Sequence, residues 1–296
     1  MSAVAFISLP GNETIAARLA HHLGGELIET EIRSFPDGET YFRLERDLHG
    51  RSVALVCTLD RPDAKILPLI FAAGTVSDLG AASVGLVTPY LAYMRQDRRF
   101  HSGEALTCKL FASLLSPYID WLVTVDPHLH RVHSLREIYD VPTRVLHAAP
   151  QIARWIASEV ENPVLIGPDK ESAQWVREVA NGAGTEFVVL DKSRSGDRKV
   201  AVAMSDMSRW HAHTPVLVDD IISTGTTMLE SMTHLRDAGM KPAVCIGIHG
   251  IFASGAYENL LAMKPARIVT TNTVKHETNA IDISELLAAG IREVMA

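Results

Sequence analysis

The chain has 296 residues, of which 47% are apolar and 21% charged, so it is large enough to bury a core without disulfides or structural metals. A formal net charge of −7 argues against general binding to nucleic acid. The cysteines, Cys57, Cys108 and Cys245, are far apart and form no CxxC or zinc spacing. The first residues, MSAVAFISLP, lack the basic region of a signal peptide, and no apolar run reaches membrane-spanning length. We therefore expect a cytoplasmic protein.

Short β-branched runs alternate with longer amphipathic stretches along the whole chain. Strands are expected at Val4–Ser8, Ser52–Cys57, Ser83–Val87, Trp121–Val125, Pro163–Gly167, Glu186–Leu190, Pro215–Val218, Ala243–Ile248 and Arg267–Thr271. Helices are expected at Glu13–Leu23, Ala64–Leu79, Leu106–Leu115, Ala149–Glu159, Lys170–Asn181, Thr226–Ala238, Gly255–Met263 and Ile283–Ala289. This alternation predicts an α/β fold with mostly parallel sheets that helices cover on both faces.

Two segments resemble each other and indicate a duplicated unit. SVALVCTLDRPDAKILPLIFAAG and PVLVDDIISTGTTMLESMTHLRDAG both run from strand through loop to helix with similar spacing. The first segment has Cys57 and Thr58 where the second has Asp219 and Asp220. We expect two tandem domains, 1–147 and 148–296, with the acidic pair and the hydroxyl-rich loop only in the second.

The segment VLVDDIISTGTT is the strongest functional signal. Asp219 and Asp220 follow an apolar strand, and Ser223, Thr224, Gly225, Thr226 and Thr227 lead into an amphipathic helix. Such a loop offers hydroxyls, backbone N–H groups and a helix N-terminus to a phosphate, while the carboxylates can accept hydrogen bonds from ribose hydroxyls. The alternative is an ordinary strand end followed by a helix cap. The concentration of acidic and hydroxyl groups favours the phosphate interpretation.

VLVDDIISTGTT resembles the phosphoribosyl-diphosphate binding motif that type I phosphoribosyltransferases share with ribose-phosphate diphosphokinases, also called PRPP synthetases. The resemblance implies two tandem type I phosphoribosyltransferase-like domains. Details of RQDRRFHSGE and DPHLH look closer to the archaeal-type (class III) branch of the synthetases. Synthetases often carry Asp at the position of Ser223 and Gly at the position of Thr226, and we expect phosphate binding to persist despite these departures.

Two further segments distinguish a synthetase from a transferase. SFPDGETYFRL resembles the synthetase arm that reaches the ATP site of a neighbouring subunit, which implies ATP contacts for Phe35, Asp37, Gly38 and Glu39. Taken alone, PDG indicates only a turn. VTPYLAYMRQDRRF resembles the Arg-Gln-Asp segment, which implies ATP contacts for Arg95 and Gln96. Guanidinium groups suit a triphosphate, although a solvated charge run gives the same pattern.

Metal and catalytic residues follow from the same resemblance. In VTVDPHLHRVHSL it implies a Mg²⁺ ligand at His128, with His130 a weaker candidate, and in VLIGPDKES it implies a second ligand at Asp169. The alternatives are a zinc site at His128, His130 and His133, and a helix cap at Asp169. In the segment VVLDKSRSGDRKV the resemblance implies catalytic roles for Lys192 and Arg194, and it places Arg194 also near the sugar phosphate. The alternative is an exposed charged loop.

The resemblance as a whole implies Mg²⁺-dependent transfer of the diphosphoryl group of ATP to C1 of ribose 5-phosphate. The products are 5-phosphoribosyl 1-diphosphate (PRPP) and AMP. A phosphoribosyltransferase and a non-catalytic regulatory paralogue are the alternatives. We expect ATP and ribose 5-phosphate as partners, no nucleic acid or membrane, and a homodimer or larger homo-oligomer because the arm works between subunits.

Overall fold

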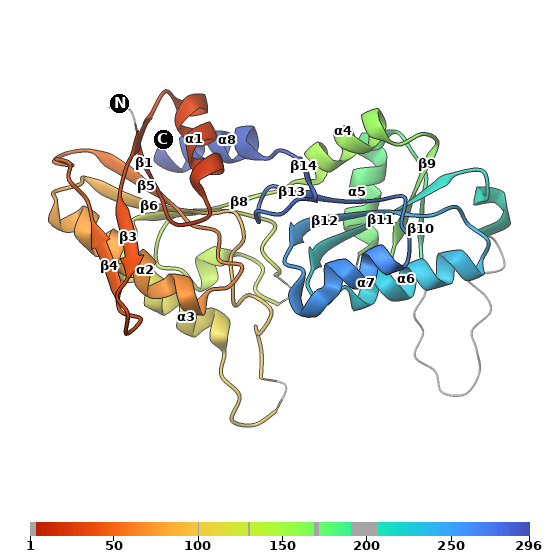
Figure 1. Ribbon diagram of the computed structural model, residues 1–296, viewed down its shortest axis with the longest axis horizontal. Coiled ribbons are helices and arrows are strands. Elements are labelled where there is room, and N and C mark those ends of the chain that lie inside the picture. Colours follow the sequence, from red (N-terminus) through yellow and green to blue (C-terminus); the bar gives the residue numbers. More distant parts are fainter. Residues whose placement is uncertain (1–3, 100, 130, 169–171, 191–206) are drawn as a thin grey trace. The chain divides into compact units, whose positions relative to one another are not determined.

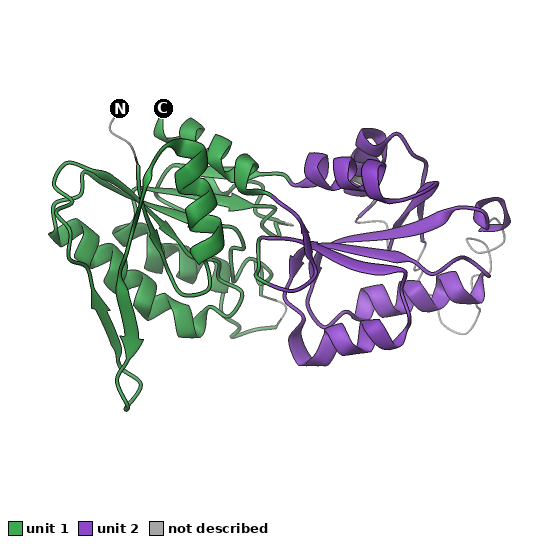
Figure 2. Cartoon of the chain, turned by 45° about the horizontal axis from the view of Figure 1, so that its top comes forward, with its two compact units in different colours: residues 1–147, 273–275, 283–296 green, residues 148–272, 276–282 purple. Residues whose placement is uncertain are grey.

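The computed structural model describes residues 4–99, 101–129, 131–168, 172–190 and 207–296. The chain forms two compact units (Figure 2). Unit 1 comprises residues 1–147, 273–275 and 283–296, and unit 2 comprises 148–272 and 276–282. The first change of unit falls between His147 and Ala148, whereas the last residues of the chain return to unit 1. The expected second domain, 148–296, differs from unit 2 in these C-terminal residues.

Unit 1 is built on a six-stranded parallel sheet in the order β2-β1-β5-β6-β7-β8 (Figure 1). Its strands are β1 (Ala5–Ser8), β2 (Glu26–Ile28), β5 (Ser52–Val56), β6 (Ser83–Thr88), β7 (Trp121–Val125) and β8 (Thr143–Leu146). Every residue of β7 is buried, as is all of β5 and β6 beyond their first residues. Such continuous apolar runs are typical of parallel strands that are covered on both faces.

Helices lie on both faces of this sheet (Figure 1). Helices α1 (Glu13–Leu23) and α8 (Ser284–Met295) pack together on one face, and α2 (Asp63–Asp78) and α3 (Thr107–Leu115) lie on the other. Short 3₁₀ turns, η1 (Ser116–Tyr118) and η2 (Leu135–Glu137), precede β7 and β8. An antiparallel hairpin of β3 (Glu31–Ser34) and β4 (Thr40–Arg43) stands apart from the six-stranded sheet.

Unit 2 contains a second six-stranded parallel sheet, in the order β10-β9-β11-β12-β13-β14. Its strands are β9 (Pro163–Gly167), β10 (Phe187–Val189), β11 (Thr214–Ile222), β12 (Val244–Gly250), β13 (Arg267–Thr271) and β14 (Asn279–Ile281). Helices α4 (Ala149–Glu159) and α5 (Ala173–Ala183) cover one face, and α6 (Thr226–Asp237) and α7 (Ala256–Ala262) the other (Figure 1). The 3₁₀ turns are η3 (Met207–Trp210) and η4 (Ala253–Gly255).

The two sheets have the same topology. When the hairpin is set aside, the strands of each unit in chain order are arranged 2-1-3-4-5-6. This makes β5 the counterpart of β11, and α2 the counterpart of α6, which is the pairing that the repeated sequence segments predict. The expected α/β fold with two parallel, helix-flanked sheets is confirmed. Within the described ranges, no helix is both long enough and apolar enough to span a membrane.

Several element boundaries differ from the sequence-based expectation. Strand β11 continues through Asp219 and Asp220 to Ile222, because its register with β12 extends to the pair Ile222 and Gly250. Helix α8 does not end at Ala289 but passes through Gly290. A Cβ atom on Gly290 would lie 2.7–3.1 Å from the side chain of Leu146, so glycine here permits close packing of helix on strand. Strands β2, β8 and β14 were not expected, since three or four residues carry too little periodicity.

Candidate functional site: a phosphate loop and two nucleotide segments

The loop between β11 and α6 has the geometry of an anion-binding turn. Gly225 has a φ of 74°, in the left-handed region that favours glycine, and it directly precedes the first turn of α6. The side chains of Thr224 and Thr226 are exposed, and their hydroxyl oxygens lie 3.0 Å apart. Ser223 and Thr227 are half-buried beside them. The loop thus presents hydroxyls next to a helix N-terminus, whose N–H groups and dipole favour a phosphate.

Two carboxylates precede this loop on the same strand. Asp219 and Asp220 are both half-buried, and Asp219 Oδ1 accepts a hydrogen bond of 3.0 Å from the backbone N–H of Asp220. Successive residues of a strand point to opposite faces, so one of the two carboxylates lies on each face of the sheet at its carboxyl edge. Carboxylates at this edge suit the hydroxyls of a sugar whose phosphate lies in the following loop.

The segment that follows β12 supports the phosphate loop from behind. The N–H groups of Ile251 and Phe252 each donate a 3.0 Å hydrogen bond to the carbonyl oxygen of Ile222, and that of Ala253 donates one of 2.9 Å to Ser223. Phe252 has a φ of 46°, a strained value for a non-glycine residue. These hydrogen bonds fix the course of the chain where β11 enters the loop. Nothing in the sequence pattern of this segment predicts this role.

An aromatic cluster holds the ring of Phe252 in place. Its centroid lies 4.4 Å from the ring of His276 and 5.4 Å from that of Tyr257, which in turn lies 4.8 Å from His276. Burial lowers the pKa of His276, which favours the neutral imidazole in this aromatic cluster. The cluster gives the strained segment behind the phosphate loop a fixed support.

The counterpart of this loop in unit 1 is closed by its own hydrogen bonds. The hydroxyl of Thr58 donates a 2.6 Å hydrogen bond to the carbonyl oxygen of Thr273, while its backbone N–H donates to Asn12 Oδ1 at 2.8 Å. Lys65 Nζ donates to the carbonyl oxygen of Thr58 at 2.8 Å and pairs with Asp60. These groups of the unit 1 loop are thus engaged in internal hydrogen bonds, and the expectation that only the second copy holds a phosphate stays a prediction.

The tip of the β3–β4 hairpin carries the predicted arm. The N–H of Phe35 donates to the carbonyl oxygen of Glu39 at 2.8 Å, and Gly38, with a φ of 94°, donates to Phe35 at 2.9 Å. Asp37 Oδ1 accepts a 3.3 Å hydrogen bond from the N–H of Glu39. The ring of Phe35 is 40% exposed, with the guanidinium of Arg33 4.8 Å from its centre. The tip therefore offers an aromatic ring and two exposed carboxylates to a ligand.

The Arg-Gln-Asp segment follows β6, and an ion pair joins it to the segment after β7. Asp97 Oδ1 lies 3.1 Å from the guanidinium of Arg131, whose backbone N–H donates to Asp97 Oδ2 at 2.9 Å. Desolvation raises the pKa of Asp97, yet the hydrogen bonds from Arg131 outweigh it and leave the pKa below its usual value. Gln96 Oε1 accepts a 3.3 Å hydrogen bond from Thr107, and the side chain of Arg95 is exposed. The sequence alone gives no indication that Asp97 and Arg131 form a pair.

The predicted metal-binding stretch begins at the carboxyl end of β7. Asp126 has a φ of 36°, and its Oδ1 lies 2.8 Å from Nδ1 of His147. His128 follows and is half-buried. No cluster of three or more His, Cys, Asp or Glu side chains suited to a metal occurs within the described part of the chain. His130, which the zinc alternative needs, lies outside that part, as do Asp169, Lys192 and Arg194.

The structure thus brings some of the predicted residues together and leaves others separate. Within unit 1, the Arg-Gln-Asp and His128 segments follow the neighbouring strands β6 and β7 and are joined by Asp97 and Arg131. Within unit 2, the acidic pair and the hydroxyl loop form one continuous site on β11 and α6. The hairpin with Phe35 belongs to unit 1 but to neither of these groups.

Family models define the class of protein to which these two units belong. Residues 4–118 match the N-terminal domain of ribose phosphate pyrophosphokinase, and residues 135–285 match the phosphoribosyl transferase domain. The chain belongs to the ribose-phosphate pyrophosphokinase family. Its PRPP-synthetase resemblance is thereby confirmed.

Full-length relatives and a solved structure agree with this assignment. The ribose-phosphate pyrophosphokinase of Sulfolobus acidocaldarius is 33% identical, over 94% of this chain and 96% of that protein. That of Methanothermobacter thermautotrophicus is 34% identical, over 95% of this chain and 98% of the relative. The crystal structure of phosphoribosylpyrophosphate synthetase from Mycobacterium smegmatis has the same fold, with a TM-score of 0.83, 22% identity and 99% coverage of both chains. Both named relatives are archaeal, and the assignment to class III stays a prediction.

Proposed function

We propose that this chain transfers the β,γ-diphosphoryl group of ATP to the C1 hydroxyl of ribose 5-phosphate. The O1 atom of the sugar attacks the β-phosphorus, and the bond from that phosphorus to the α–β bridging oxygen breaks. AMP leaves with the bridging oxygen, and the hydroxyl proton passes to solvent. The products are PRPP and AMP, and positioning and electrostatic stabilisation supply the rate.

The observation that carries this proposal is the loop on β11 and α6. Ser223, Thr224, Gly225, Thr226 and Thr227 would hold the 5-phosphate. Asp219 and Asp220 would accept hydrogen bonds from ribose hydroxyls and so orient the sugar. The topologically equivalent loop of unit 1 is closed by Thr58 and Lys65. One acceptor site per chain follows.

The ATP half of the site rests on two segments of unit 1. Arg95 and Gln96 would contact the nucleotide, and Gln96 accepts a hydrogen bond from Thr107. Phe35 would stack on the adenine base, while Asp37 and Glu39 accept hydrogen bonds from its polar edge, and Gly38 permits the tight turn. We assign the hairpin to the ATP site of another copy in a homodimer or larger homo-oligomer, since its aromatic tip is exposed.

Mg²⁺ suits the side chains at the sheet edges. The half-buried carboxylates Asp219 and Asp220 are hard oxygen donors of the kind that Mg²⁺ prefers. His128 and Asp169 would hold the ion together with ATP. When bound, Mg²⁺ offsets charge on the phosphate oxygens. Lys192 and Arg194 would stabilise the charge that builds up on the β-phosphoryl group, with Arg194 also near the sugar phosphate.

The cytoplasm is the proposed compartment, because the three cysteine thiols are free and buried. Desolvation raises the pKa of Cys57 and of Cys245 to about 12, which keeps both thiols protonated and unreactive.

The reaction is tested by incubating the protein with ATP, Mg²⁺ and ribose 5-phosphate and following AMP and PRPP by chromatography. We expect equal amounts of the two products. Lys192→Ala should lower kcat by about 100-fold or more, because charge stabilisation at the transferred group is lost. A phosphoribosyltransferase would instead consume PRPP with a nucleobase. A regulatory paralogue would bind nucleotide without turnover, and either result would reject the proposal.

The role of the hairpin between copies is tested by mixing two inactive variants. Phe35→Ala with Asp37→Ala damages the donated arm, whereas Asp219→Asn damages the acceptor loop. If the arm acts in a neighbouring copy, reassembled mixtures recover up to about a quarter of the wild-type activity, since some sites then receive both intact parts. No recovery from mixtures of confirmed composition would place the arm in its own subunit.

A further inference from the structure

A chain of hydrogen bonds leads from the edge strands of unit 2 to the aromatic cluster behind the phosphate loop. Its members are Asn279, Thr270, Thr278 and His276, and the two threonines are buried. Asn279 Nδ2 lies 2.8 Å from Thr270 Oγ1, which itself lies 2.8 Å from Thr278 Oγ1. Thr278 Oγ1 in turn lies 2.9 Å from Nδ1 of His276. The chain therefore connects β13 and β14 with the imidazole that packs on Phe252.

Two backbone groups fix the direction of every hydrogen bond in this chain. The carbonyl oxygen of Thr271 can only accept, and it lies 2.8 Å from Asn279 Nδ2, which fixes the orientation of this amide. The backbone N–H of Thr278 can only donate, and it lies 3.3 Å from Nδ1 of His276, so that nitrogen is an acceptor. Asn279 then donates to Thr270, and Thr270 donates to Thr278. The hydroxyl of Thr278 is left to donate to His276, which requires the neutral tautomer with its proton on Nε2.

The ring of Phe252 contacts both this imidazole and the end of β12. Its centroid lies 4.4 Å from that of His276. A Cβ atom at Gly250 would lie 2.7 Å from the Phe252 ring and 2.8 Å from the methyl group of Thr270, so glycine leaves the room that the ring needs. The backbone N–H of Phe252 donates to the carbonyl oxygen of Ile222, where β11 enters the phosphate loop. A displacement of the imidazole therefore reaches that loop through one ring and one hydrogen bond.

We propose that His276 is a positioning residue for ribose 5-phosphate, which holds Phe252 and through it the loop from Ser223 to Thr227. The hydrogen bond from Thr278 fixes the plane of the imidazole, and the imidazole fixes the ring whose backbone supports the loop. His276 acts through Phe252 rather than on the substrate. This inference rests on the proposed function, and it extends the sugar-phosphate site to residues on the edge strands of unit 2.

The test is steady-state kinetics of the full chain, with ATP and ribose 5-phosphate varied separately. His276→Ala should raise the KM for ribose 5-phosphate by about three- to tenfold, because the contact between the two rings is lost. The KM for ATP and kcat should stay within about twofold of the wild type, since only binding of the sugar phosphate is weakened. Thr278→Val keeps the imidazole and removes the hydroxyl that orients it, so it should raise the same KM by about two- to fivefold. This milder change gives a decision even if His276→Ala does not fold.

A double variant shows whether His276 acts through Phe252. In a Phe252→Ala background, His276→Ala should raise the KM for ribose 5-phosphate no further, because the ring that it holds is already absent. Two independent effects would instead multiply.

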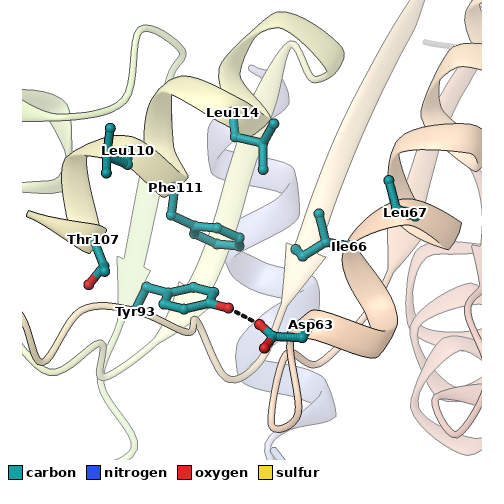
Figure 3. Close-up of a pocket in the computed structure, with 8 residues that line it drawn as sticks. All are labelled: Asp63, Ile66, Leu67, Tyr93, Thr107, Leu110, Phe111 and Leu114. Carbon is teal, nitrogen blue, oxygen red and sulfur yellow. Dashed lines mark hydrogen bonds between the residues drawn. The ribbon is translucent and has the colours of Figure 1, made fainter. Parts of the chain in front are cut away.

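Two matched controls lie outside the chain of hydrogen bonds. His213 is a half-buried histidine of unit 2 whose ring lies 4.9 Å from that of Trp210, and it precedes β11 at the end opposite to the loop. Tyr93 of unit 1 donates a hydroxyl hydrogen bond to Asp63, as Figure 3 shows. His213→Ala removes a comparable ring and Tyr93→Phe a comparable hydroxyl. Both variants should leave the KM for ribose 5-phosphate unchanged.

Binding of ribose 5-phosphate is also measured by calorimetry, with Mg²⁺ and an ATP analogue that has a methylene group in place of the α–β bridging oxygen. An unchanged affinity for ribose 5-phosphate in His276→Ala, equal increases in both KM values, or multiplied effects in the double variant would overturn the inference. If the wild type makes PRPP and His276→Ala binds the sugar phosphate as tightly, the inference fails and the proposed function stands. If His276→Ala weakens binding but the wild type forms no PRPP, the proposed function fails and the positioning role stands. A wild type that does not bind ribose 5-phosphate rejects both.

Discussion

Replacing Gly225 by alanine tests the phosphate loop at its most constrained position. Gly225 has a φ of 74°, and an alanine in this conformation is strained by about 1–2 kcal/mol. Its Cβ would lie 3.5 Å from Ala256 and Leu260, an ordinary contact, so the strain comes from the backbone alone. We expect the melting temperature to fall by about 2–8 °C. If the loop relaxes and loses one hydrogen bond to the phosphate, about 1.5–3 kcal/mol, the KM for ribose 5-phosphate rises roughly 10- to 150-fold.

Gly184→Ala provides the matched control. Gly184 caps α5 in the same unit with a φ of 66°, and a Cβ atom there meets nothing within 4 Å. Gly184→Ala should lower the melting temperature by the same amount and leave the KM for ribose 5-phosphate unchanged. Steady-state kinetics with varied ribose 5-phosphate and thermal unfolding decide the matter. An unchanged KM in Gly225→Ala, or equal KM changes in both variants, would refute the role of the loop.

Three further predictions concern Asp97 and Phe252 near the candidate site and the packing of helix α8. Asp97→Asn should destabilise unit 1 by about 1–3 kcal/mol at pH 7. Folding lowers the pKa of Asp97. The difference in stability is therefore fully present above the pKa of the unfolded carboxyl group, and it shrinks as the pH falls through the pKa of the folded state. Urea unfolding of both proteins at pH 7 and near pH 3 measures it, and a pH-independent difference would contradict the ion pair. Phe252→Ala should raise the KM for ribose 5-phosphate by about tenfold and leave the KM for ATP unchanged. Phe252→Tyr should retain most of the affinity for ribose 5-phosphate. Equal effects of Phe252→Ala on both KM values would indicate a general loss of structure. Gly290→Val should lower the free energy of unfolding by about 1–3 kcal/mol because the new side chain contacts Leu146, whereas Gly74→Ala, in open space on α2, should raise it by about 0.5–1 kcal/mol. Thermal unfolding measures both changes. A Gly290→Val variant of unchanged stability would contradict the close packing of α8 on β8.

The central elements of both sheets could be predicted because their sequences report burial directly. Strands β5 and β6, and the part of β11 before Asp219, are largely apolar runs, and α1 and α4 have one buried face at helical spacing. Short edge strands such as β2 and β14 could not be predicted, since three residues carry too little periodicity and the strands depend on hydrogen bonds to a neighbouring strand. Gly290 appeared to end a helix, whereas its role is to let α8 approach Leu146.

The candidate site also contains parts that a short sequence segment indicates and parts that depend on distant partners. The loop from Asp219 to Thr227 could be proposed as a phosphate site from the sequence because it is one short segment in which composition and order carry the chemistry, and its role stays a prediction. The bond between Asp97 and Arg131 was not, because 34 residues separate the partners and only the pairing of β6 with β7 brings them together. The support from Phe252 was missed for a similar reason. Its partners, Ile222 and His276, come from distant parts of the chain.

Isotope tracing of the transferred group tests the assigned reaction most directly. Protein is incubated with Mg²⁺, ribose 5-phosphate and ATP labelled at either the α- or the γ-phosphorus. Transfer of an intact diphosphoryl group predicts that the γ-label appears in PRPP and the α-label in AMP, with one AMP formed for each PRPP. A γ-label on a sugar monophosphoryl product together with ADP, or no labelled product from either nucleotide, would contradict the assignment.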